Sequence, residues 1–147
     1  RYGTVTGVQT CALPILADWL GRCRAYVNAG LEDFGIAPVE AMAAGAPVIA
    51  YGAGGFCDSV RPLDGETNQP TGVLFSEQSV AGVVAALEHF SSRRLWLQLP
   101  PEGQRLWAET FSPIRFQRRM TRLLEGLWQQ HNRQLHHARA PLSGLCL

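Results

Sequence analysis

The stretch that decides the fold runs from Gly30 to Gly55 and reads Gly-Leu-Glu-Asp-Phe-Gly-Ile-Ala-Pro-Val-Glu-Ala-Met-Ala-Ala-Gly-Ala-Pro-Val-Ile-Ala-Tyr-Gly-Ala-Gly-Gly. It predicts an alanine-rich helix that begins near Ile36 and ends at Gly45. Pro38 falls in the first turn, where a helix tolerates its missing N–H, and glycine is the preferred residue just past a helix end. The consecutive apolar residues 47–51 predict a strand that is buried on both faces, as in a parallel sheet.

Strands and helices alternate on both sides of this stretch. We expect strands over 24–29 and 71–75, and helices over 16–22, 56–60, 76–90, 102–109 and from Pro113 to about His131. In the helix over 76–90, Val80, Val83, Val84 and Leu87 share one face. Alternating elements imply right-handed crossovers, so the predicted fold class is α/β, a partial Rossmann-like parallel sheet with flanking helices. Three strands are fewer than a complete doubly wound domain contains.

The composition excludes several classes of protein. Apolar residues make up 46% of the chain and charged residues 17%, which is typical of a globular domain. The net charge of +1 predicts no general attraction to nucleic acid. All 13 basic residues are arginine, so no lysine chemistry is available. The four cysteines are far apart, which predicts free thiols in a reducing cytoplasm and no metal site. No apolar run is long enough to span a membrane.

Residues 1–15 differ from the rest of the chain, because residues 5–15 have neither a helical nor a strand period. These eleven residues, Val-Thr-Gly-Val-Gln-Thr-Cys-Ala-Leu-Pro-Ile, resemble the translation of a common sequencing adapter. We therefore expect residues 1–15 to be a non-native extension and the natural sequence to begin near Leu16, with more protein upstream. An ordinary flexible N-terminus is the alternative.

The central stretch predicts a ligand site, because open parallel sheets bind ligands at the carboxyl ends of their strands. Glu32 follows the first strand, and the glycines at 52–55 follow the second. The helix near Ile36 directs free N–H groups and its positive end to the same place, which suits a phosphate. Two carboxylates, Glu32 and Glu40, can each accept hydrogen bonds from a diol, so the pattern fits a nucleotide sugar. Alternatively, Glu40 stabilises its own helix electrostatically.

The residues from Glu32 to Tyr51, with Gly54 and Gly55, closely resemble the signature of the family 4 glycosyltransferases: Glu, seven residues, Glu, then a Gly-x-Pro-Val-Ile-Ala strand. The resemblance covers roughly residues 16–131. It implies the later part of the C-terminal, donor-binding domain of a GT-B enzyme, which is built from two Rossmann-like domains. The implied activity is transfer of a hexosyl group, with retention, from a nucleotide-diphosphate sugar to a glycan or a lipid-linked acceptor.

The resemblance also implies roles for single residues. Glu32 would act in catalysis, binding donor-sugar hydroxyls near the anomeric carbon, and Glu40 would bind the ribose. The other implied substrate-binding residues are Asp33, Phe34, Gly35, Ile36, Gly54 and Gly55. The leaving diphosphate would help to deprotonate the acceptor, so no cofactor and no metal are expected.

The sequence departs from the family pattern in ways that affect the expected activity. The arginine and lysine that hold the pyrophosphate in the family, and the acceptor-binding N-terminal domain, have no counterpart here, and Asp58 replaces a common glutamate. We therefore expect residues 16–131 to form a truncated domain that is inactive alone, and residues 132–147 to form a flexible tail. The amino-acid sequence around Glu32 and Val48 resembles that of bacterial mannosyltransferases of surface-polysaccharide assembly. This resemblance favours GDP-mannose as the donor.

The expected partners are the nucleotide sugar, the acceptor and the N-terminal domain of the same protein, and no nucleic acid is expected. The expected location is cytoplasmic. A second possibility is peripheral contact with the inner face of the plasma membrane through the basic final helix. The alternative functions are a non-catalytic nucleotide-sugar-binding module and a GT-B-like sugar-nucleotide epimerase.

Overall fold

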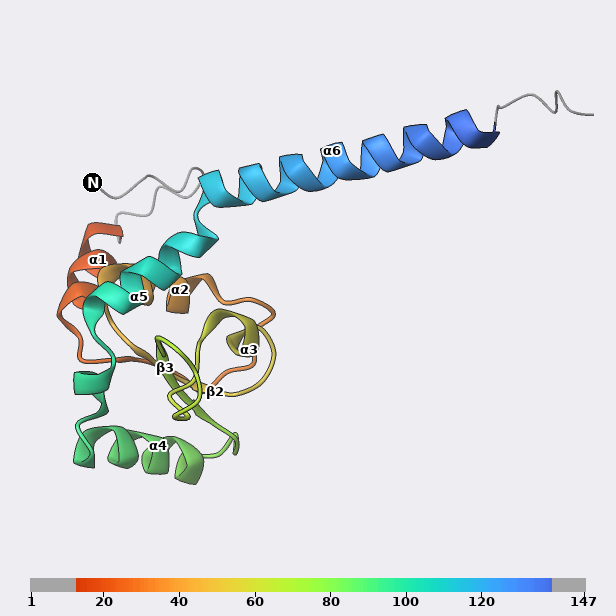
Figure 1. Ribbon diagram of the computed structural model, residues 1–147. Helices are drawn as coiled ribbons and strands as arrows, with labels where there is room; N and C mark the ends of the chain where they lie inside the picture. Colours follow the sequence, from red (N-terminus) through yellow and green to blue (C-terminus); the bar gives the residue numbers. More distant parts are fainter. Residues whose placement is uncertain (1–12, 139–147) are drawn as a thin grey trace, which may run out of the picture. The chain divides into compact units, whose positions relative to one another are not determined.

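The structure, a computed structural model, describes the backbone of residues 13–138 and divides the chain into two units at Thr110. The first unit holds a three-stranded parallel sheet in the order β1-β2-β3, formed by Tyr26–Asn28, Val48–Tyr51 and Gly72–Phe75. Tyr26 pairs with Val48, and Val48 pairs with Gly72. The predicted α/β fold with a parallel sheet and flanking helices is confirmed (Figure 1).

Helices cover both faces of this sheet, and Figure 1 shows α2 and α5 on one side and α4 on the other. The helices of the first unit are α1 (Leu13–Arg22), α2 (Ile36–Ala44), α3 (Phe56–Ser59), α4 (Val80–Ser92) and α5 (Pro101–Ala108). Two short 3₁₀ helices, η1 (Leu95–Gln98) and η2 (Glu109–Phe111), follow α4 and α5. The last residue of η2, Phe111, is the first residue of the second unit. Successive side chains of a strand point to opposite faces. Val48 and Ala50 therefore pack with Met42, whereas Ile49 packs with Phe90.

Helix α2 has the limits that its sequence predicts. It begins at Ile36 and ends at Ala44, and the next residue, Gly45, has a left-handed φ of 100° that suits glycine. The Gly45 N–H donates to the carbonyls of Ala41 and Met42, and the Arg105 guanidinium donates to the carbonyl of Ala44 at 3.2 Å. The small alanine side chains allow α1 to pack close to α2. Ala41 and Ala44 are buried in a cluster with Leu20 of α1.

Helix α4 differs from its prediction in both its start and its buried face. It begins at Val80, where the Ser79 hydroxyl accepts the N–H of Gly82, and not at residue 76. Its buried residues are Ala86 and Phe90, whereas Val80 and Val84 are 83% and 46% exposed. Of the predicted face, Val83 packs against the core cluster, whereas Val80, Val84 and Leu87 are exposed. The reason is that this side of α4 lies over the hollow beside Ala29, just past the end of β1, and not over a strand.

Helix α5 is fixed by a hydrogen bond from the Trp107 indole N–H to the carbonyl of Ser59, at 2.7 Å. We expect Trp107→Phe to lower the free energy of unfolding by about 1–3 kcal/mol, because it leaves a carbonyl in a buried region without this donor. Urea denaturation followed by circular dichroism measures the loss. Trp19→Phe is the control, since Trp19 is 66% exposed on α1. Equal stabilities for the two variants would contradict the role of this hydrogen bond.

The second unit contains helix α6, Pro113–Ala138. Ser112 and Pro113 begin it as predicted, and the Ser112 carbonyl accepts the N–H of Phe116. The helix continues to Ala138, past His131 and into the segment that we expected to be a tail. Of the predicted extension at 1–15, residues 1–12 lie outside the described residues, and 13–15 belong to the first turn of α1. Within residues 13–138, no helix combines the length and the apolar character that a membrane crossing requires.

Candidate functional site

The candidate site is built on the loops that follow the three strands, at the carboxyl edge of the sheet. After β1 the chain turns where the Asn28 side chain accepts the N–H of Gly30 at 2.7 Å. This turn leads into the loop that carries Glu32 and Asp33, both of which are exposed. The exposed carboxylates are therefore held on the surface of this edge, accessible to a ligand.

The loop after β2 packs directly on the Glu32 loop. The N–H of Gly55 donates to the carbonyl of Glu32 at 2.7 Å. A Cβ atom on Gly55 would collide with the backbone of Asp33 and Phe34, and one on Gly54 would collide with the Glu32 carbonyl. Both positions therefore require glycine for close approach. The structure thus brings Glu32, Asp33 and Phe34 together with Gly54 and Gly55, two loops that are 20 residues apart in the sequence.

The N-terminus of α2 opens beside the Glu32 loop. Its N-cap residue is Gly35, with φ 75° and ψ 95°, and no side chain caps the helix. A φ of this sign favours glycine. The first N–H groups of a helix have no partner within it, and together with the positive end of the dipole they attract anions. Ile36, the first helical residue, is 66% exposed. This helix start can therefore receive a phosphate-sized anion without moving a capping side chain.

Glu40 lies one turn further along α2, four residues after Ile36 and hence on the same side of the helix. It is half-buried, and the first turn of α2 contains no acidic residue. The favourable interaction of a carboxylate with the helix dipole is confined to the first turn. Glu40 therefore lies just past the first turn, on the side of the helix that carries Ile36.

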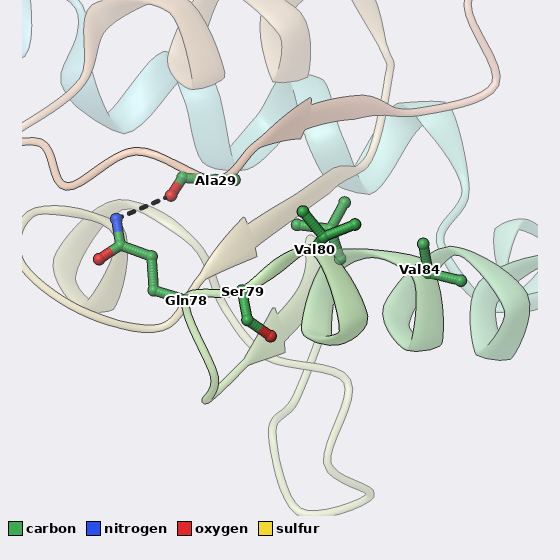
Figure 2. Close-up of a pocket in the computed structure, with 6 residues that line it drawn as sticks. Ala29, Gln78, Ser79, Val80 and Val84 are labelled. Carbon is green, nitrogen blue, oxygen red and sulfur yellow. Dashed lines mark hydrogen bonds between the residues drawn. The ribbon is translucent and has the colours of Figure 1, made fainter.

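The loop after β3 completes this edge of the sheet. Gln78 donates from its side-chain amide to the carbonyl of Ala29 at 3.0 Å and so joins the third loop to the first (Figure 2). The residues Ala29, Gln78, Ser79, Val80, Val83 and Val84 line a hollow of about 450 Å³. This hollow is mostly apolar and lacks charged side chains, so it does not suit a phosphate or a sugar. Sequence reasoning missed Gln78, because no pattern links residues 78 and 29.

Two side chains outside this edge have shifted pKa values. Burial raises the pKa of the Cys23 thiol. The backbone N–H groups of Thr67 and Glu66, together with the Thr67 hydroxyl, hold the pKa of Asp64 below its ordinary value. Asp64 lies in the loop between α3 and β3. These two shifts are therefore local features of the scaffold and not part of the candidate site.

Comparison with known proteins identifies the family. Residues 16–100, more than half of the chain, match the profile of "Glycosyl transferases group 1". The chain belongs to this family. The match includes every residue of the candidate site. Among curated protein sequences, no match was found.

Solved structures agree with the fold of a group 1 glycosyltransferase. The chain is similar to sucrose-phosphate synthase (tll1590) from Thermosynechococcus elongatus, with a TM-score of 0.63 and 25% identity over 79% of this chain. It is also similar to the catalytic domain of starch synthase IV from Arabidopsis thaliana, solved with ADP and acarbose, with a TM-score of 0.53 and 24% identity over 67% of this chain. The group 1 chain spans only 28% and 22% of the lengths of these two proteins.

Proposed function

We propose that this chain is the nucleotide-sugar-binding part of a retaining glycosyltransferase that moves a hexosyl group from a nucleotide-diphosphate sugar to a glycan or lipid-linked acceptor. The family membership supports sugar transfer as the reaction class. The observation that carries the proposal is the helix start at Gly35, which no side chain caps, with exposed Glu32 in the loop before it and half-buried Glu40 on the helix behind it.

Each part of such a donor has a counterpart among these residues. The diphosphate lies at the N-terminus of α2, where the N–H groups of Gly35, Ile36 and Ala37 stabilise the negative charge that grows as the glycosidic bond breaks. The Glu40 carboxylate accepts hydrogen bonds from the ribose hydroxyls. Glu32 holds the sugar hydroxyls close to the reacting carbon, together with the loop residues Asp33 and Phe34. Gly54 and Gly55 pack against the backbone of that loop.

Catalysis by such a site consists of positioning and charge stabilisation. In the proposed reaction the acceptor oxygen attacks on the face from which the diphosphate leaves, and a diphosphate oxygen takes its proton. No protein nucleophile and no metal are needed. In this proposal, protein outside this chain supplies the acceptor-binding domain and further basic groups for the diphosphate, so the chain alone binds the donor without turnover.

The two glutamates give the sharpest test of this arrangement. We expect Glu40→Gln to weaken binding of both GDP and GDP-mannose by about 10- to 100-fold, because it removes a charge-assisted hydrogen bond to the ribose. We expect Glu32→Gln to weaken GDP-mannose binding and to leave GDP binding unchanged, since Glu32 contacts only the sugar. Titration calorimetry with the 147-residue chain measures both dissociation constants. UDP and ADP, with their glucose and mannose forms, test the choice of nucleotide.

Glu88→Gln on α4 is the matched control, because Glu88 is an exposed glutamate outside the site. It should bind every ligand as the unchanged chain does. If a folded chain binds none of the nucleotides, or if Glu40→Gln binds GDP as tightly as Glu88→Gln does, the proposal is wrong. Sugar transfer by the chain alone would contradict the proposed division of the site, and loss of GDP binding with a chelator would contradict the metal-free arrangement.

A further inference from the structure

Ser59 is a polar residue in the core of the first unit. It is the last residue of α3 and is fully buried. Its hydroxyl donates to the carbonyl of Gly55 at 2.8 Å. A buried hydroxyl without a partner is costly, so this hydrogen bond is part of the folded structure. Serine in a helix often bonds to the carbonyl four residues earlier. The consequence of the bond in this protein therefore depends on what Gly55 itself contacts.

Gly55 joins the two loops of the candidate site through its backbone. Its N–H donates to the carbonyl of Glu32 at 2.7 Å. Its carbonyl accepts two hydrogen bonds from Ser59, one from the hydroxyl at 2.8 Å and one from the backbone N–H at 3.0 Å. Glycine has the greatest backbone freedom and has no side chain to pack. The position of Gly55 therefore depends on these backbone contacts, and the Ser59 hydroxyl restrains the residue that holds Glu32.

The carbonyl of Ser59 is fixed in turn by helix α5. The indole N–H of Trp107 donates to this carbonyl at 2.7 Å. The Arg61 guanidinium lies over the Trp107 ring, 4.9 Å from its centroid, and so restrains the indole. A continuous series of hydrogen bonds thus runs from Trp107 through Ser59 and Gly55 to Glu32. We call these four residues the α5–Glu32 series. All of them lie in the first unit.

We propose that Ser59 is a positioning residue of the donor site, which holds Gly55 and thereby sets the place of Glu32. This inference rests on the proposed function, in which Glu32 binds the hydroxyls of the donor sugar, and deepens it. Interactions at a reacting centre weaken steeply when a group is displaced by as little as about 1 Å. The start of α2 and Glu40, which bind the diphosphate and the ribose in the proposed function, are outside the α5–Glu32 series. Ser59 therefore affects the sugar end of the donor and not the nucleotide end.

Titration calorimetry with the 147-residue chain tests this selectivity. We expect Ser59→Ala to weaken GDP-mannose binding by about three- to tenfold and to leave GDP binding unchanged. Thr71→Val is the matched control. Thr71 is also fully buried, and its hydroxyl accepts the N–H of Arg61 at 2.9 Å. It precedes β3 and therefore lies at the opposite edge of the sheet from the candidate site. The control should bind both ligands as the unchanged chain does.

Hydrogen exchange of the Gly55 amide, followed by NMR without any ligand, tests the same link independently. Ser59→Ala should speed exchange at Gly55 about fivefold relative to exchange at Ala46, since one hydrogen bond of ordinary strength contributes about that factor. The N–H of Ala46 donates to the carbonyl of Ala41 at the end of α2, so it reports general loosening. Thr71→Val should leave this ratio unchanged.

Trp107→Phe is a second variant, which releases the α5–Glu32 series at its other end. It should weaken GDP-mannose binding in the same selective way and by a smaller factor, because the Ser59 hydroxyl remains. If Ser59→Ala does not fold, a Trp107→Phe chain with unchanged binding of both ligands and unchanged exchange at Gly55 would overturn the inference.

Two results with a folded Ser59→Ala chain would also overturn it. One is an exchange rate at Gly55 that rises no more than in Thr71→Val. The other is an equal loss of GDP and GDP-mannose binding, since that indicates a general structural defect. A folded unchanged chain that binds no nucleotide would instead refute the proposed function. Faster exchange at Gly55 in Ser59→Ala would in that case still support the link from Ser59 to the Glu32 loop.

Discussion

Replacing Gly55 with alanine is expected to lower the free energy of unfolding by about 3 kcal/mol or more. The added Cβ atom would collide with the backbone of Asp33 and Phe34, and backbone cannot turn aside as a flexible side chain can. Gly55 has φ −64° and ψ −13°, an ordinary helical conformation, so the cost is steric and not conformational. The hydrogen bond from Gly55 to Glu32 would be lost as the two loops separate.

Urea denaturation followed by circular dichroism measures this loss, and Gly21→Ala is the matched control. A Cβ atom on Gly21 meets nothing within 4 Å, and Gly21 lies inside helix α1. The control should therefore be at least as stable as the unchanged chain. Similar midpoints for the two variants would show that the loops after β1 and β2 do not pack as described.

Phe56→Ala is expected to destabilise the first unit by about 3–5 kcal/mol, the range for removing a buried aromatic side chain. Phe56 is fully buried at the start of α3, in a cluster with Met42, Val48 and Val60. Its ring supports the turn that carries Gly54 and Gly55, so the same variant should also weaken donor binding if the proposed function is right.

The matched control for Phe56→Ala is Phe116→Ala, because Phe116 is 60% exposed on α6. Surface substitutions of this kind change stability by less than about 0.5 kcal/mol. Thermal denaturation followed by circular dichroism compares the two variants. A loss for Phe56→Ala no larger than that for Phe116→Ala would contradict the position of Phe56 in the core.

The elements around the candidate site could be predicted because local chemistry decides them. Pro38 and Gly45 mark the two ends of α2, and the apolar run at Val48 marks a buried parallel strand. These features depend on residues close in sequence. The sequence also placed the loops at Glu32 and Gly54 at one edge, since parallel strands end together. The roles of Glu32 and Glu40 toward a ligand stay predictions.

The rest could not be predicted, because it depends on contacts between distant residues. The valines of α4 have the spacing of a core face, yet Ala86 and Phe90 are the residues that reach the sheet. Which side of α4 lies over the sheet depends on strand order, and strand order is not encoded in helical periodicity. The hydrogen bond between Gln78 and Ala29 joins residues 49 positions apart, and no local pattern predicts it.

The position of α5 has a consequence for synthesis on the ribosome. Arg105 reaches back to Ala44, 61 residues earlier, and Ala108 completes the cluster around Met42 and Phe56. A nascent chain that ends before residue 101 therefore presents the apolar side of α2 and α3 to solvent without its cover. Because domains fold as units during translation, this core closes only after residue 108 has left the exit tunnel. While a ribosome pauses with residues 101–108 still inside the exit tunnel, this apolar side stays open to chaperones and to aggregation.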